Sequence, residues 1–63
     1  MKATIFLSYS DDSEVCFTYE CDENRTQALG TLLMVCRGTL MASMANKITA
    51  YNEEGFELCS YQR

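Results

Sequence analysis

The sequence contains no histidine and no proline, and only five of its 63 residues are lysine or arginine. Histidine is the side chain that most readily acts as a base near neutral pH, so its absence disfavours acid–base catalysis. No linker or low-complexity tract interrupts the chain either, and we expect a single domain over residues 1–63. The five cations are scattered, which leaves no basic stripe to neutralise phosphates. They are Lys2, Arg25, Arg37, Lys47 and Arg63.

Motifs of catalysis and cofactor binding are missing as well. The chain has no P-loop and no G-x-G-x-x-G sequence. Its acidic pairs at 11–12, 22–23 and 53–54 fall in expected turns or at an expected helix start, where carboxylates are solvated. We therefore expect a protein that is not an enzyme and that uses no cofactor.

Four cysteines are present, at positions 16, 21, 36 and 59. Structural zinc sites gather their ligands in close pairs, and gaps of four, fourteen and twenty-two residues provide none, so we expect no metal site. The first residues lead into a strand pattern without a secretory signal, which indicates a reducing cytoplasm and free thiols. A thiol or metal-binding protein is the weakest of the functional alternatives.

Period-two alternation predicts a first hairpin. Residues 3–9 and 14–20 alternate between apolar and polar types, and the polar cluster at 10–13 favours a turn between them. Ala3, Ile5, Leu7 and Tyr9 share one face of the first strand, and Val15, Phe17 and Tyr19 are expected to face inward from the second.

A helix is expected to begin near Arg25, with Asn24 as its N-cap and with acid charge from Asp22 and Glu23 before it. Apolar residues then recur at spacings of three and four as far as about Ala45. This inward face consists of Leu29, Leu32, Leu33, Cys36, Leu40 and Met44. Asn46 and Lys47 are typical of a helix C-terminal end.

A second hairpin is predicted over 48–52 and 56–61, because Gly55 supplies the positive φ that a tight turn needs. The order of elements is therefore β-β-α-β-β, an α+β fold in which one long helix packs on a small antiparallel sheet. Residues 28–45 are almost uncharged, but Arg37 lies at their middle and several small polar residues dilute them, so we expect no membrane span.

One helix covers only one side of a sheet, and we call the other side the open sheet face. Outward parity places Phe6, Cys16, Thr18, Thr49, Tyr51, Cys59 and Tyr61 on it. Tyrosine and phenylalanine are typical anchors of protein interfaces. We expect the site residues on this face to be Phe6, Thr18, Tyr51 and Tyr61, unless a different strand register turns some of them inward.

The outer stripe of the helix is a second candidate surface, formed by Met34, Arg37 and Met41 beside Gly30 and Gly38. Methionines make adaptable binding surfaces, and small residues let another backbone approach closely. The alternative is that these methionines fill the core and that Arg37 is an ordinary surface cation.

An aromatic sheet face is also typical of proteins that stack single-stranded RNA. Glu20 and Glu57 are expected on the same face and would repel phosphate. A nucleic-acid-associated regulator therefore ranks below a protein-interaction module and is kept as the alternative function.

In size, acidity and layout, the whole chain, from ATIFLSYS through NRTQALGTLLMVCRGTLMASM to KITAYNEEGFELCSYQR, resembles the small accessory proteins encoded in the early regions of lambdoid phages and prophages. The resemblance implies a modulator that binds a host or phage protein, and it carries over no functional residue. A chain this short has a thin stability margin, which self-association would increase. We therefore predict a non-enzymatic protein-interaction module in the cytoplasm that forms a homodimer and binds a protein partner.

Overall fold

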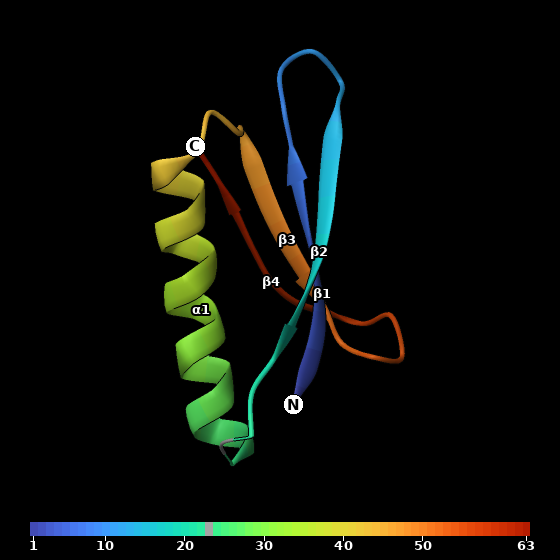
Figure 1. Ribbon diagram of the computed structural model, residues 1–63, viewed down its shortest axis with the longest axis vertical. Helices are drawn as coiled ribbons and strands as arrows, with labels where there is room; N and C mark the ends of the chain where they lie inside the picture. Colours follow the sequence, from blue (N-terminus) through green and yellow to red (C-terminus); the bar gives the residue numbers. More distant parts are fainter. Residues whose placement is uncertain (23) are drawn as a thin grey trace.

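The elements follow one another in the predicted order β-β-α-β-β in the computed structural model, which describes residues 1–22 and 24–63 (Figure 1). They are β1 (Lys2–Ser8), β2 (Glu14–Glu20), α1 (Arg25–Ala42), β3 (Lys47–Tyr51) and β4 (Glu57–Gln62). The strands form one antiparallel sheet in the order β2-β1-β3-β4, with α1 along one side. The predicted fold class is confirmed.

The first hairpin has the register that its alternation predicts. Ile5 lies opposite Phe17, and Leu7 lies opposite Val15, so these four side chains share the face toward α1. In the turn, the Ser13 hydroxyl and backbone N–H both donate to Asp11 Oδ1, at 2.5 and 3.0 Å. These two bonds hold the pKa of Asp11 below its ordinary value, because they stabilise the carboxylate.

The start of α1 follows the prediction. Asn24 has extended backbone geometry, and its Oδ1 accepts a hydrogen bond of 3.0 Å from the Gln27 N–H, which otherwise has no partner within the helix. Glu23, one of the two acids expected before the helix, lies outside the described residues.

The end of α1 differs from the prediction, because the helix stops at Ala42 and not near Ala45. Ser43 leaves the helical path, its hydroxyl donates to the Leu40 carbonyl at 3.1 Å, and the Arg63 guanidinium donates to the carbonyls of Leu40 and Ser43. The Leu40 carbonyl in the last turn of the helix is therefore satisfied by two side chains, one of them from the far end of the sequence. Lys47 begins β3 and does not cap the helix.

In the second hairpin, Asn52 Oδ1 accepts the backbone N–H groups of Glu54 and Phe56, at 3.0 and 2.9 Å. Gly55 has a φ of 89°, as the turn prediction requires. This hairpin joins the first through β3, which pairs with β1 and so completes the sheet.

The core lies between α1 and the sheet. The helix buries a single row spaced four residues apart, and the strands contribute alternate residues to the same core. Its members are Ala3, Ile5, Leu7, Leu32, Cys36, Leu40, Ala45, Ile48 and Ala50, with Ala28 also buried on the helix.

The helix does not cover the whole of the sheet, because it packs mainly against β3 and β4. Val15 on β2 has the predicted inward parity but is 48% exposed, since it lies at the far edge of the sheet order. Within residues 1–22 and 24–63, no helix combines the length and the apolarity needed to cross a bilayer.

Candidate protein-interaction surfaces

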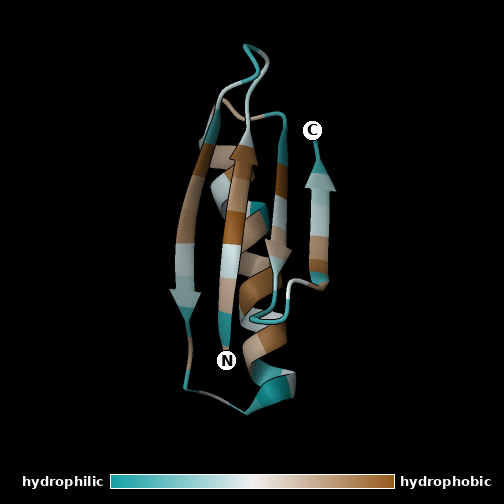
Figure 2. Ribbon diagram, turned by 90° about the vertical axis from the view of Figure 1, so that its right-hand side faces the viewer, coloured by the Kyte–Doolittle hydropathy of each residue, from teal (hydrophilic) through white to brown (hydrophobic). Residues whose placement is uncertain are grey.

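The open sheet face is the side of the sheet opposite α1, which Figure 2 turns toward the viewer. The rings of Phe6 on β1 and Tyr51 on β3 meet edge to face at its centre, with centroids 5.6 Å apart and an interplanar angle of 78°. Both rings are half-buried, and Thr18 beside them is exposed. Three of the four residues predicted for this face therefore lie on it, because their strands alternate without interruption.

Small and charged side chains surround the aromatic pair. Thr49 lies opposite Phe6 on the same face, is only 7% exposed, and shares a hydrogen bond of 3.3 Å with the Ser60 hydroxyl. A shallow hollow of about 410 Å³ adjoins the pair, lined by Phe6, Ser8, Glu14, Lys47, Thr49 and Tyr51. The open sheet face thus combines an aromatic centre with charges of both signs.

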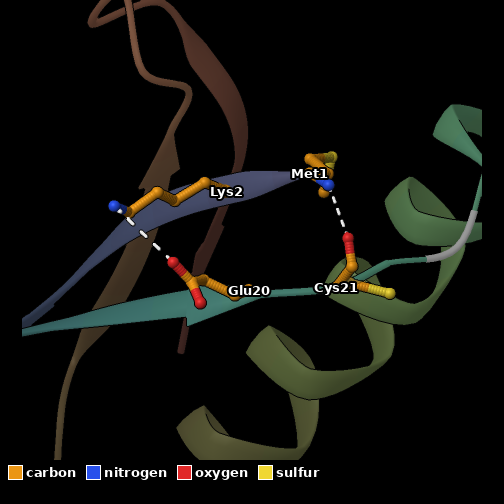
Figure 3. Close-up of polar contacts among 4 residues, drawn as sticks. All are labelled: Met1, Lys2, Glu20 and Cys21. Atoms are coloured by element: carbon orange, nitrogen blue, oxygen red, sulfur yellow. Dashed lines mark hydrogen bonds and ion pairs between the residues drawn. The ribbon is translucent and has the colours of Figure 1, made fainter.

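The end of the sheet near the N-terminus carries a further charge pair. Lys2 Nζ lies 3.6 Å from Glu20 Oε1 across β1 and β2, and the Met1 amino group donates to the Cys21 carbonyl at 2.5 Å (Figure 3). Both side chains of the ion pair are more than half exposed, so the pair adds little to stability. It nevertheless places one cation beside one of the acids that were expected to repel phosphate.

The placement of Tyr61 and Cys59 on the open sheet face was wrong. Tyr51 lies opposite Glu57, but Ala50 lies opposite Cys59, so β4 has one extra residue, Leu58, at this point. Such a bulge reverses the parity of everything after it. Cys59 and Tyr61 consequently face α1 and pack against the core, and Glu57 keeps its predicted side.

The reversal brings Tyr61 to two of the residues predicted on the helix stripe. The Arg37 guanidinium carbon lies 5.8 Å from the centre of the Tyr61 ring, within cation–π range. A hollow of about 260 Å³ opens beside them, and we call it the helix–β4 groove; its lining is Arg37, Leu40, Met41, Tyr61, Gln62 and Arg63. None of these residues is acidic, although the chain has a net charge of −4.

The methionines of the stripe are not core filler. Met34 is 76% exposed and Met41 is 80% exposed, and a Cβ added at Gly30 or Gly38 would meet nothing within 4 Å. Met44, predicted on the inward face, is 84% exposed because the helix ends before it. The outer side of α1 therefore exposes apolar methionines to solvent, with Arg37 between them.

Sequence reasoning missed two residues of the groove region. Arg63 lines the groove and donates a hydrogen bond to the Leu40 carbonyl in the last turn of α1, although the two residues are 23 positions apart in the sequence. Leu58 sets the register of β4. Arg63 belongs to no periodic pattern, and Leu58 lies within the alternating segment 56–61 without any sign that it is an extra residue, so the sequence carries no local signal for either role.

The four cysteines are free thiols and lie in different environments. Cys16 is exposed on the open sheet face, Cys21 is half-buried beyond β2, and Cys36 and Cys59 meet between α1 and β4 with their sulfurs 3.8 Å apart. Burial, together with Cys59, raises the pKa of Cys36 to about 12. In the described part of the chain, no three potential metal ligands converge.

Comparison of the chain with protein-family models, with curated proteins and with solved structures finds no match.

Proposed function

We propose that this chain is a non-catalytic protein-interaction module that forms a homodimer through the open sheet face and binds a second protein at the helix–β4 groove. The observation that carries the proposal is the Phe6–Tyr51 pair at the centre of a sheet face that no described element covers. An antiparallel sheet that meets only water on one side normally presents polar residues there. Aromatic residues ringed by polar ones are typical of interface centres.

The charges on the open sheet face favour a second copy as its occupant. Glu14 and Lys47 line the same hollow beside the aromatic pair. When two such faces meet about a two-fold axis, each acid can lie near the other copy's lysine, so the contact is complementary to itself. Burying the aromatic centre would also add apolar area to a chain of only 63 residues.

The helix–β4 groove carries positive charge only, whereas the open sheet face carries both signs, so the groove suits a different partner. Arg37 and Arg63 are its cations, and Met41 and Tyr61 supply apolar contact area. Two copies meeting at this groove would bring Arg37 toward Arg37, which is unfavourable. A protein segment that carries carboxylates beside an aromatic residue fits both features, and its source, by the resemblance to phage accessory proteins, is a host or phage protein.

The first test is the oligomeric state. We expect the protein to elute as a dimer in size-exclusion chromatography with light scattering, and we expect Tyr51→Glu to weaken the dimer by about 30-fold or more. The reason is that the substitution places a charge at the desolvated centre of the contact on both copies. Circular dichroism of the variant establishes that its fold is retained.

Phe56→Glu is the matched control, because Phe56 is an aromatic residue 69% exposed on the turn before β4 and away from the aromatic pair. The dissociation constant of the Phe56→Glu dimer should equal that of the parent dimer. A monomeric parent at high micromolar concentration contradicts self-association. Binding of a single-stranded RNA probe at low salt that Tyr51→Glu abolishes would assign the open sheet face to nucleic acid instead.

The groove is tested with a short peptide that holds one phenylalanine between two glutamates. We expect it to shift the NMR signals of Arg37, Met41 and Tyr61, and we expect Arg37→Glu to weaken binding about fivefold, the effect of losing one partly exposed ion pair. Arg25→Glu, in the first helical turn and outside the groove, is the control. Equal binding of a peptide with lysines in place of glutamates contradicts the proposed charge preference.

A further inference from the structure

Two cysteines that are far apart in sequence lie in contact inside the fold. Cys36 is fully buried on the core row of α1, and Cys59 lies on β4 opposite Ala50, on the face toward the helix. Their sulfurs are 3.8 Å apart, with 22 residues between them in the chain. The bulge at Leu58 creates this contact, because it turns Cys59 inward.

We propose that Cys36 and Cys59 form an oxidisable dithiol, whose disulfide ties α1 to the edge strand β4, with a small-molecule disulfide of the glutathione type as the oxidant. This inference is independent of the proposed function. A disulfide needs its sulfurs about 2.05 Å apart, so they must approach by roughly 1.8 Å. Rotation of the two side chains about their Cα–Cβ bonds is the motion available for that approach.

The other two cysteines do not compete for the pair. Cys16 lies on the open sheet face, so the sheet itself separates it from Cys36 and Cys59. Cys21 lies beyond β2, which is at the opposite edge of the sheet from β4. The fold therefore selects one pairing out of the several that four cysteines allow.

Exposure determines the order of the two steps. Cys59 is half-buried and Cys36 is fully buried with a raised pKa, so Cys59 meets the oxidant first. Its thiolate attacks oxidised glutathione, forms a mixed disulfide and releases one glutathione thiolate, which takes up the proton that Cys59 lost. Cys36 then loses its proton, attacks the Cys59 sulfur and expels the second glutathione. Overall, two protein thiols become one disulfide, and one oxidised glutathione becomes two reduced ones.

The experiment uses the full chain with Cys16→Ser and Cys21→Ser, incubated with oxidised glutathione. We expect the mass to fall by two hydrogen atoms, peptide mapping to link Cys36 to Cys59, and Tm to rise by about 8 °C or more in a domain of this size. Dithiothreitol should reverse both changes. The unsubstituted chain should give the same linked peptide.

Cys59→Ser in the same background is the control, and it should show neither the loss of hydrogen nor the rise in Tm. A mixed disulfide that persists on Cys59 would overturn the proposal, because it would show that Cys36 cannot reach the second step. A link to Cys16 or Cys21 in the unsubstituted chain, or an unchanged Tm after cross-linking, would overturn it as well.

Discussion

Replacing Leu32 by alanine is expected to lower the free energy of unfolding by about 2–5 kcal/mol. Leu32 is fully buried on α1 and belongs to the cluster that joins the helix to β1 and β3. A chain of this length has a total stability of roughly 3–9 kcal/mol, so this one substitution removes a large part of it. Urea denaturation followed by circular dichroism measures the effect, with parent and variant at one concentration because dimerisation contributes to apparent stability.

Leu29→Ala is the matched control, since it makes the same chemical change on the same helix. Leu29 is 36% exposed at the side of the buried row, so its loss should cost about 1 kcal/mol. Equal losses at both positions would contradict the helix face described above. They would instead indicate that α1 packs on the sheet through the periodicity expected from the sequence, in which both leucines face inward.

Much of the fold follows from patterns that act over a few residues. Alternation in β1 and β2 predicts which side chains face the helix, Asn24 predicts the start of α1, and Gly55 predicts a turn with positive φ. Each signal is local, because a strand repeats every two residues and caps and turns satisfy their own backbone groups. The face of Phe6 and Tyr51 could be predicted for the same reason.

The features that sequence reasoning missed depend on contacts between distant segments. At the end of α1, Arg63 donates to the carbonyls of Leu40 and Ser43 from the far end of the sequence. The extra residue in β4 is visible only when that strand is paired with β3. Tyr61 therefore joins Arg37 and Met41, and the predicted sheet site and helix site share a boundary at β4.

This rearrangement changes which surface suits which partner. With Tyr61 on the open sheet face, that face would hold three aromatic rings and the helix stripe would be methionines around one arginine. With Tyr61 beneath Arg37, the helix side gains an aromatic wall and a cationic groove, while the open sheet face keeps Phe6 and Tyr51 with charges of both signs. The second arrangement gives the two faces different electrostatic characters, which is the basis for assigning them different occupants.

Deleting Leu58 tests the register of β4, because it removes the one extra residue between Glu57 and Cys59. Without the extra residue, Glu57 opposite Tyr51 is followed directly by Cys59 opposite Ala50, so strict alternation along β4 keeps Cys59 and Tyr61 on the side of α1. The helix would lose only the partly buried contact of Leu58, so the free energy of unfolding should fall by about 1 kcal/mol. Oxidised glutathione should still link Cys36 to Cys59, and Cys59 should react with a thiol reagent more slowly than the exposed Cys16.

Leu58→Ala separates the register from the side chain, because it retains the residue count of β4 and removes only apolar contact. It should lower stability by about 1 kcal/mol, leave Cys59 shielded and preserve the Cys36–Cys59 link. If the deletion variant instead exposes Cys59 and loses that link, Glu57 and Cys59 do not pair with Tyr51 and Ala50 as described above. The helix–β4 groove, which Tyr61 lines, would then need a different pairing of β4.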